Sequence, residues 1–313
     1  YTTINKQTDY FNTVLYTGDG STQNITGVGF QPDLVWAKRR QNGNHQWYDA
    51  VRGATKVIWS DGTWAESSYA DGLTSFDSDG FTAGGNGDLN ANGGTYAYWN
   101  WKAGTGQGSS NTDGSINTTY TSVNTTAGFS ISKYTGTGSN ATVGHGLGVA
   151  PAMIIIKKLN SATGSNWMVY HKSISGTGNG HIWLDLTNAS STDTNSWNNT
   201  APTSSVFSIG TRTENNNSGD TYIAYCFAEK TGYSKFGSYT GNGNSDGTFV
   251  YTGFKPSWLM IKQTNSTENW HIFDIKRNPY YPTSSSYGGM ATRLMANLSN
   301  ADDLSQGGFR FLS

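Results

Sequence analysis

The chain has 313 residues, enough for about two to three domains of ordinary size. Lys and Arg number 20 against 21 Asp and Glu, a net charge of −1, and only 13% of the residues are charged. Such a chain lacks the concentrated basic field that nucleic acid or an anionic membrane surface requires, so we expect neither partner. No apolar run approaches the ~18 residues of a membrane span, so we expect no membrane insertion. The single cysteine, Cys226, excludes internal disulfides and cysteine-based metal clusters.

Three copies of one pattern follow each other along the chain. Tyr-Thr-Gly-x-Gly occurs at residues 16–20, 134–138 and 239–243, and each copy precedes a proline and an apolar segment that ends in lysine. The prolines are Pro32, Pro151 and Pro256, and the tryptophans that follow the lysines are Trp47, Trp167 and Trp270. Several matched markers in one order indicate three repeats. We interpret these prolines and tryptophans as a structural framework, with the tryptophans at one shared core position.

Each repeat has the strand pattern of an all-β protein. In chain order, strands are expected within residues 29–38, 92–101, 148–157, 217–229 and 253–262, bounded by Gly, Asn, Ser and Asp. The continuous apolar run at 152–156 is typical of a strand buried on both faces. Only residues 64–69 and 290–298 suggest a helical turn. The pattern predicts three tandem β-sandwich (jelly-roll-like) repeats.

The predicted domains are residues 1–104, 115–231 and 232–313, and a Gly/Ser-rich linker at 105–114 joins the first two. The third repeat lacks the Gly-x-Thr-Tyr strand that closes the other two. Because a sheet without that strand has an unpaired edge, we expect the third repeat to be incomplete at its C-terminal end and the natural chain to continue beyond Ser313. Repeats stacked in a row predict a stiff, extended shaft.

No arrangement of residues points to catalysis. Glycan hydrolysis needs two carboxyls about 5–9 Å apart, and the candidates are Asp49, Glu66, Asp77, Asp79, Asp185 and Asp274. Asp49 and Arg52 match Asp274 and Arg277, while the second repeat has Tyr-His-Lys-Ser at residues 170–173. An Asp and an Arg three residues apart in two repeats indicate an internal ion pair that belongs to the framework. We expect no catalytic residue, no metal site and no cofactor, with a glycan hydrolase as the alternative.

Aromatic side chains outside the framework are the candidates for binding. Exposed Trp and Tyr rings present an apolar face on which a sugar ring can stack. The candidates for glycan contact are Trp64, Trp183, Trp197, Tyr280 and Tyr281, which fall in segments that differ between the repeats. Packing against a loop is the alternative for each of them.

The repeats resemble those of tail-fibre and other virion-surface proteins of bacteriophages, especially marine phages. The likeness covers nearly the whole chain. It is carried by Gly-His-Gly-Leu-Gly-Val-Ala-Pro at 144–151 with Met-Ile-Ile-Ile-Lys at 153–157, and by residues 222–229, 253–262 and 270–279. These are framework motifs, so the resemblance implies a scaffold and carries no catalytic residue across.

The resemblance implies a non-enzymatic structural or adhesive component of a phage virion, such as a tail fibre or a related surface fibre. It places the protein on the virion surface, outside cells, as a homo-oligomer with a trimer favoured. Its expected partners are other virion proteins and a host-surface polysaccharide. The alternatives are a head-attached decoration protein, a glycan depolymerase and a secreted carbohydrate-binding array.

Overall fold

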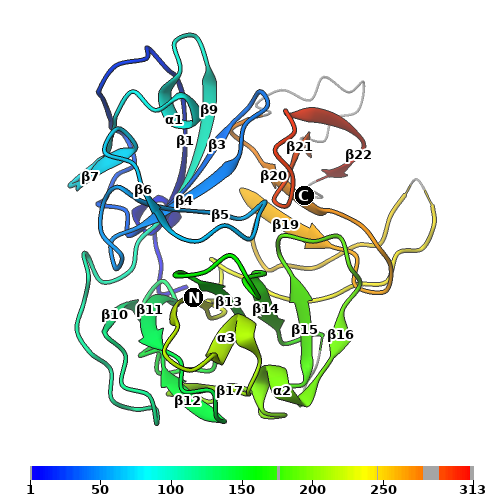
Figure 1. The fold of residues 1–313 in the computed structure, drawn as a ribbon. Helices are drawn as coiled ribbons and strands as arrows, with labels where there is room; N and C mark the ends of the chain where they lie inside the picture. Colours follow the sequence, from blue (N-terminus) through cyan, green and yellow to red (C-terminus); the bar gives the residue numbers. More distant parts are fainter. Residues whose placement is uncertain (1, 175–176, 245, 278–288, 311–313) are drawn as a thin grey trace.

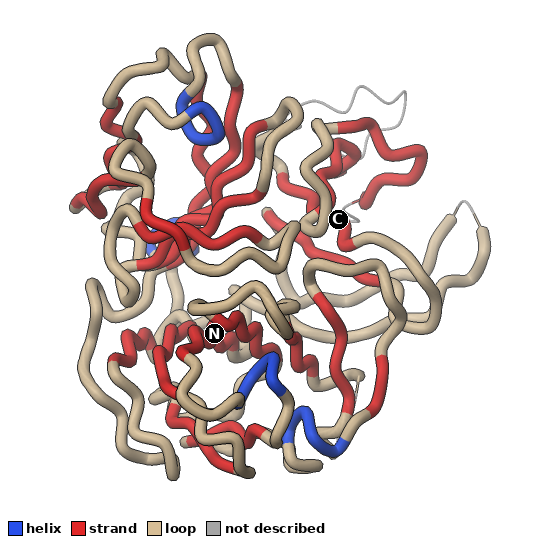
Figure 2. The backbone as a smooth tube through the Cα atoms, in the orientation of Figure 1, coloured by secondary structure: helices blue, strands red, loops and turns tan. Residues whose placement is uncertain are grey.

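The computed structural model describes residues 2–174, 177–244, 246–277 and 289–310, whose regular structure is nearly all β-strand (Figures 1 and 2). The chain forms several antiparallel sheets, none of which closes into a barrel. The predicted all-β class with a β-sandwich architecture is therefore confirmed. Among these residues, no helix has the length and apolar character that crossing a membrane would require.

The first repeat is a sandwich of two sheets. Six strands form one sheet in the order β1-β9-β3-β4-β5-β6, and three form the other in the order β2-β8-β7. The elements are η1 (Gln7–Asp9), β1 (Phe11–Thr17), β2 (Gln23–Ile25), β3 (Leu34–Arg39), β4 (His45–Asp49), β5 (Lys56–Trp59), β6 (Ser67–Ser68), β7 (Leu73–Asp77), β8 (Gly80–Ala83), α1 (Gly87–Asn90) and β9 (Thr95–Trp101). Residues 64–69 contain β6 and not the expected helical turn, because Lys56 and Val57 pair with Ser68 and Ser67.

The second repeat has the same plan, with one edge strand added to the large sheet and two strands in place of three in the small sheet. Its large sheet has the order β10-β11-β18-β13-β14-β15-β16, and β12 pairs with β17 in the small one. The elements are β10 (Tyr120–Asn124), β11 (Phe129–Thr135), β12 (Ala141–Gly144), β13 (Met153–Lys158), β14 (Met168–His171), β15 (Gly180–Trp183), β16 (Ser191–Thr192), α2 (Thr194–Trp197), β17 (Val206–Ile209), α3 (Thr213–Asn216) and β18 (Thr221–Phe227).

The third repeat has one sheet among the described residues, with the order β19-β20-β21-β22. Its strands are β19 (Trp258–Lys262), β20 (Trp270–Asp274), β21 (Gly289–Met295) and β22 (Asp303–Arg310), and β21 replaces the expected helical turn at 290–298. The described residues of 236–257, which hold the third Tyr-Thr-Gly-x-Gly copy, form no strand. In the first two repeats the equivalent strands β1 and β11 pair with β9 and β18. The third copy has no such partner among the described residues, so it does not form a ladder.

Strand register shows which residues are equivalent in the three repeats. Two residues after each framework proline, Leu34, Met153 and Trp258 pair with Asp49, His171 and Asp274. His45 is therefore the equivalent of Trp167 and Trp270, and Trp47 lies two residues further along the same face of its strand. The prediction of one shared tryptophan position is wrong for the first repeat, although all three tryptophans are buried.

Backbone and lysine hydrogen bonds join each repeat to both others. The amino group of Lys157 donates to the Thr63 carbonyl at 3.1 Å, that of Lys262 to Thr187 at 3.1 Å, and that of Lys38 to Ser299 at 3.3 Å. Three residues after each acceptor, a backbone N–H donates back across the same boundary. These pairs are Glu66 to Leu159 at 2.7 Å, Ser190 to Thr264 at 2.8 Å and Asp302 to Arg40 at 2.7 Å. The lysine bonds run from the second repeat to the first, the third to the second, and the first to the third, and the backbone bonds run the opposite way.

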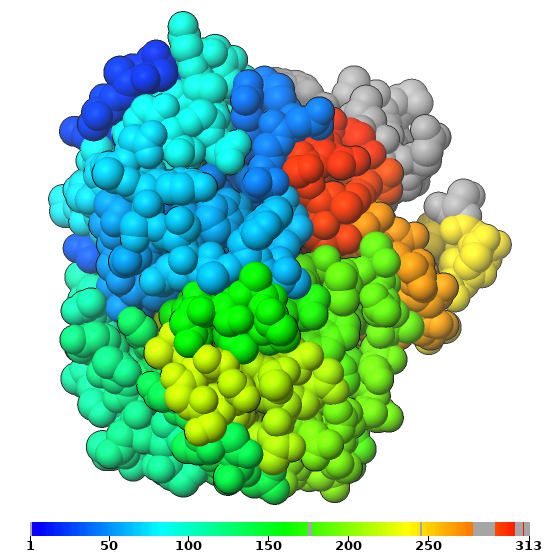
Figure 3. Space-filling view, in the orientation of Figure 1, coloured from blue at the N-terminus to red at the C-terminus, as the bar shows by residue number. Residues whose placement is uncertain are grey.

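The three repeats consequently close into a ring with approximate threefold symmetry. Figure 1 shows them around a common centre, and in Figure 3 the blue to cyan, green, and orange to red parts of the chain lie directly against one another. One buried cluster takes side chains from all three repeats, among them Trp36, Trp167 and Ile272. The large sheets of the first two repeats thus bury one face within their own repeat and the other against the neighbouring repeats. The expected extended shaft is wrong, because this apolar face is covered by the other two repeats.

The first residues of the Gly/Ser-rich segment 105–114 are held by hydrogen bonds to the first repeat. The buried Asp33 carboxylate accepts the N–H groups of Ala103, Thr105 and Gly106 at 2.7, 3.0 and 2.7 Å. Ser109 then forms a bridge with Thr121 of the second repeat. The segment is therefore part of the folded structure that joins two contacting repeats.

Candidate functional site

The two Asp-Arg elements lie in the boundaries between repeats. Arg52 Nε is 2.5 Å from Asp49 Oδ2, both side chains are buried, and Tyr225 of the second repeat donates its hydroxyl to the same Asp49 oxygen at 2.7 Å. Burial alone would lower the pKa of Arg52, but the carboxylate of Asp49 raises it above the ordinary value. A fully partnered buried pair of this kind supports a structural role.

The third repeat has the same arrangement. Arg277 Nε is 2.5 Å from Asp274 Oδ2, and Trp99 of the first repeat donates its indole N–H to that oxygen at 3.0 Å. In the second repeat the register places His171 at the Asp position, one residue away from the tyrosine that sequence alignment placed there. The strand that would supply the equivalent of Trp99 and Tyr225 to His171 is absent from the described part of the third repeat.

The remaining candidate carboxylates also have structural partners. Asp185 Oδ1 accepts the backbone N–H of Trp167 at 3.0 Å, as Asp61 does for His45 at 3.2 Å and Asn297 for Trp270 at 2.9 Å. Burial raises the pKa of Asp185 above its ordinary value and that of Asp61 to about 7. Asp77 accepts from the hydroxyls of Ser75 and Thr82, and Asp79 accepts from the N–H groups of Gly27 and Gly29. In the described ranges no three His, Cys, Asp or Glu side chains are placed to hold a metal ion.

The predicted aromatic residues have different environments. Trp64 is 49% exposed, whereas Trp183 is half-buried beneath the guanidinium of Arg212. Trp197 is 1% exposed, because α2 packs its ring against Tyr170 and its indole N–H donates to Gly180. The prediction of Trp197 as a surface residue is therefore wrong. Tyr280 and Tyr281 lie outside the described residues.

Trp64 lies in a cleft on the first repeat that sequence analysis did not assemble. This aromatic cleft has a volume of about 390 Å³ and is lined by Asn44, Trp59, Trp64, Ala65, Glu66, Ser67, Tyr69 and Asp88. The β5–β6 hairpin supplies the three aromatic rings. Trp59 meets both Trp64 and Tyr69 edge to face, with ring centroids 5.8 and 5.9 Å apart. These contacts hold the rings in defined orientations beside an open space.

Fixed polar groups complete the aromatic cleft. Glu66 Oε2 is 3.3 Å from Arg52 Nη1, so the buried ion pair at the repeat boundary also positions this carboxylate. Asp88 lies in α1, whose N-cap Asn86 accepts its backbone N–H, and its Oδ2 accepts from Gln46 at 3.3 Å. Asn44 and Ser67 add an amide and a hydroxyl. The cleft therefore combines aromatic surface with hydrogen-bonding groups, as small-molecule sites commonly do.

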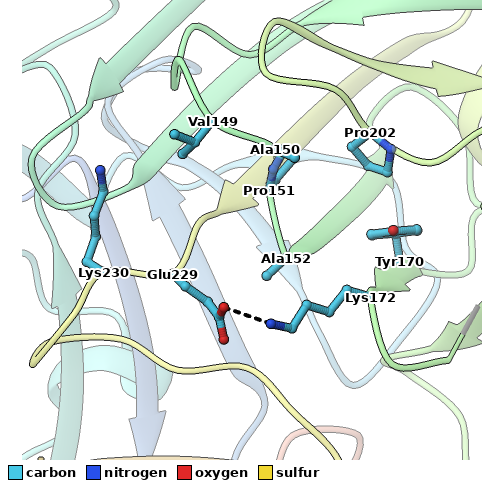
Figure 4. A pocket seen from close by; sticks show the side chains of 9 residues that line it. All are labelled: Val149, Ala150, Pro151, Ala152, Tyr170, Lys172, Pro202, Glu229 and Lys230. Atoms are coloured by element: carbon cyan, nitrogen blue, oxygen red, sulfur yellow. Dashed lines mark ion pairs between the residues drawn. The ribbon is translucent and has the colours of Figure 1, made fainter. Parts of the chain in front are cut away.

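A second pocket, the Pro151 pocket, lies on the second repeat (Figure 4). It has a volume of about 340 Å³, and its lining residues are Val149, Ala150, Pro151, Ala152, Tyr170, Lys172, Pro202, Glu229 and Lys230. Lys172 and Glu229 form an ion pair at 2.7 Å, the dashed line in Figure 4. Tyr170 is the only aromatic residue among those lining it, so it offers less stacking surface than the aromatic cleft.

The sequence pattern indicated Trp64 as a binding residue but not Trp59, Tyr69 or Asp88. The spacing of five residues between Trp59, Trp64 and Tyr69 around one hairpin was a usable signal for the aromatic cluster. Asp88 had no comparable signal, because it belongs to α1, which follows the β5–β6 hairpin in the sequence only after β7 and β8.

Comparison with known proteins identifies a family. A family model described as "Domain of unknown function (DUF7483)" matches residues 6–313, nearly the whole chain. No curated protein and no solved structure matches the chain.

Proposed function

Since the chain belongs to this domain family of unknown function, we propose its function from its residues and its surface. It is a non-enzymatic structural and adhesive component of a bacteriophage virion, part of a tail fibre or a related surface fibre. Its aromatic cleft binds host-surface glycan. The framework motifs that resemble virion-surface proteins support the location, and the aromatic cleft supports the binding role.

The aromatic cleft is the observation that carries the binding role. Trp64 exposes about half of its surface, whereas every other tryptophan of the described residues is buried or half-buried. A sugar ring stacks its C–H face on such a ring, while its hydroxyls need nearby acceptors and donors, which Asn44, Glu66 and Ser67 provide. The cleft stands on a rigid hairpin tied to the second repeat through the Glu66 N–H and the Leu159 carbonyl.

A glycan depolymerase is the competing function, because Glu66 and Asp88 line the same cleft. Both carboxylates are engaged, however, with Arg52 and Gln46 respectively. Hydrolysis requires one carboxyl to release a proton and the other to remain free for the sugar or water. The arrangement therefore favours binding over cleavage. An assay for new reducing ends on host polysaccharide should give none, and release that Glu66→Gln abolishes would make the protein an enzyme.

Glycan binding is tested by titrating the purified chain with host-surface polysaccharide and its oligosaccharides. Trp64→Ala should weaken binding about tenfold or more, because it removes the exposed stacking surface. Val149→Ala, at an exposed apolar position of the Pro151 pocket, is the matched control and should bind as the parent does. Equal loss in both variants, or no loss in either, would contradict binding in the aromatic cleft.

Assembly and location need separate measurements. Several copies in one particle would convert weak single contacts into avid attachment, and a homotrimer is the assembly that we favour. Light scattering of the purified chain measures the oligomer directly. Antibody labelling of particles should decorate tail-attached fibres, whereas labelling of the head would support a decoration protein. Absence of the chain from purified particles would support a secreted carbohydrate-binding protein.

A further inference from the structure

A second place on the molecule is equivalent to the aromatic cleft and is filled by an arginine. In the strand register Trp59 corresponds to Trp183. Trp59 pairs with Gln46, the residue after His45, and Trp183 pairs with Met168, the residue after Trp167. Trp59 contributes to the aromatic cleft. Trp183 instead has the guanidinium carbon of Arg212 over its ring, 5.3 Å from the centroid.

The carboxylates around Arg212 have equivalents in the first repeat as well. Arg212 Nη1 is 2.5 Å from Asp193 Oδ2, and Arg212 Nε is 3.2 Å from Glu214 Oε2. Asp193 and Tyr69 are equivalent, since each donates its backbone N–H to the carbonyl of a residue four positions before a corresponding tryptophan. That tryptophan is Trp183 for Asp193 and Trp59 for Tyr69. Glu214 and Asp88 are equivalent, since each lies two residues before an asparagine whose carbonyl accepts the N–H of the last glycine of a Tyr-Thr-Gly-x-Gly copy. The first repeat therefore has equivalents of the tryptophan below Arg212 and of one of its two carboxylates, namely Trp59 and Asp88.

The arginine itself is missing from the first repeat. Arg212 is the N-cap residue of α3, and the equivalent N-cap of α1 is Asn86. Asn86 uses its side chain to accept the Asp88 N–H and is not among the residues that line the aromatic cleft. Glu66 adds a second carboxylate to the cleft, at the position of Ser190. The result is an aromatic site with two acidic residues and no basic residue among its lining residues.

We propose that the aromatic cleft binds a saccharide through a positively charged amino group, which takes the place that Arg212 occupies in the second repeat. This inference rests on the proposed glycan-binding function and names the chemical class of its ligand, an oligosaccharide of unacetylated amino sugars. Trp59 is only 7% exposed, so the ammonium group meets the part of its ring that lines the cleft and bonds to Asp88, where cation–π attraction and a charge-assisted hydrogen bond add to each other. The Trp64 face stacks on the sugar ring. The cleft has a volume of about 390 Å³ and contains the Trp64 ring beside that of Trp59. These features favour a sugar as the ligand over an arginine side chain alone.

The test compares three oligosaccharides of equal length by calorimetric titration of the full chain at pH 6. These are a glucosamine tetramer, its fully N-acetylated counterpart and cellotetraose, which has no nitrogen. The glucosamine tetramer should bind at least about tenfold more tightly than the other two, a difference of about 1.4 kcal/mol. Asp88→Asn should remove this preference without changing the thermal midpoint of unfolding by more than a few degrees.

A substitution that refills the site gives an independent readout. Asn86→Arg places an arginine at the N-cap that Arg212 occupies in α3, and it should abolish glucosamine binding by occupying the cleft. Asn86→Ser keeps an N-cap acceptor without a cation and should bind as the parent does. Unchanged binding by Asn86→Arg, with the arginine shown over Trp59 by indole NMR shifts, would overturn the proposal.

The remaining outcomes separate this inference from the proposed function. Equal binding of all three tetramers, lost in Trp64→Ala, would overturn the amino-sugar assignment and leave the glycan site standing. Binding of an arginine-containing peptide without binding of any tetramer would overturn the assignment in favour of a protein ligand. Failure of every tetramer, of the peptide and of host polysaccharide would contradict both the inference and the proposed function.

Discussion

Trp270 of the third repeat donates its indole N–H to the backbone carbonyl of Trp183 in the second repeat, 2.7 Å away. Trp167 of the second repeat donates in the same way to the Trp59 carbonyl in the first, also at 2.7 Å. Each of these two bonds connects the buried tryptophan of one repeat to the last residue of a strand in the neighbouring repeat, β15 for Trp270 and β5 for Trp167. Through Trp59, the same relationship supports a wall of the aromatic cleft.

Removing one of these donors should destabilise the whole chain. Trp270→Phe keeps an aromatic ring but leaves the Trp183 carbonyl without its indole partner, a loss that costs about 1 kcal/mol for a partly buried hydrogen bond. Urea unfolding followed by tryptophan fluorescence and far-UV circular dichroism measures this change. Trp64→Phe, at an exposed ring, is the control and should change stability by about 0.5 kcal/mol or less. An equal effect of the two substitutions would contradict the role of the Trp270 bond.

The boundary between the first two repeats has its own test in Tyr225. Its hydroxyl donates to Asp49 Oδ2 at 2.7 Å in a fully buried site. Tyr225→Phe should lower the free energy of unfolding by about 1–3 kcal/mol, because the carboxylate loses one of its donors. Tyr251→Phe, at a tyrosine that is 78% exposed, is the matched control and should leave stability unchanged. A neutral Tyr225→Phe would mean that Arg52 alone satisfies Asp49.

Asp61 should make stability depend on pH in a defined direction. Burial raises its pKa in the folded chain to about 7, against an ordinary value of 3.8, so the folded state holds the proton more tightly than the unfolded state. This contribution is fully present below about pH 4 and is lost as the pH rises through 7. Asp61→Asn should therefore raise the melting temperature relative to the parent more at pH 8 than at pH 4.

The third repeat supplies the precedent for that substitution. Asn297 occupies the position of Asp61, and its Oδ1 accepts the Trp270 N–H as Asp61 accepts that of His45. The amide can thus replace the carboxylate as an acceptor without carrying charge. Asn297→Asp is the reciprocal change and should destabilise more at pH 8 than at pH 4. A pH-independent effect of both substitutions would show that Asp61 does not titrate in this range.

Proteolysis should begin in residues 236–257. Tyr239, Phe249 and Tyr251 are 48%, 66% and 78% exposed and lie in a segment whose described residues form no strand, whereas Tyr134, the equivalent of Tyr239, is buried in β11. Exposed segments without backbone ladders are the usual sites of nicking. Brief chymotrypsin digestion followed by mass spectrometry should find the first cuts after these three residues and none after Tyr134. Early cleavage after Tyr134 would contradict the paired β11–β18 ladder.

The repeats and their strands were predictable because their signals are local. A proline, an apolar run and a terminal lysine recur in order, and the register places Pro32, Pro151 and Pro256 two residues before equivalent positions. The ring was not predictable, because the lysines reach backbone carbonyls at Thr63, Thr187 and Ser299, and any residue type provides a carbonyl.

The candidate site was predictable only in part for a similar reason. Trp64 stood out as an aromatic residue in a variable segment, and its exposure agrees with that reading. Trp197 gave the same signal and is buried, because contact with Tyr170 depends on how α2 packs on the second repeat. The sequence did not show that His45, and not Trp47, is the equivalent of Trp167 and Trp270. Trp47 lies two residues beyond that position, and the spacing from lysine to tryptophan differs between the repeats by as much as two residues.

Small-angle X-ray scattering tests the closed ring most directly, on the chain diluted until light scattering gives the mass of one copy. A compact chain of this length has a radius of gyration of about 20 Å, and the repeats around a common core should give a value close to that. Three such repeats arranged in a row would exceed about 25 Å and show the extended pair-distance tail of a rod. A compact value supports the ring, and a rod-like profile from a monodisperse monomer would contradict it.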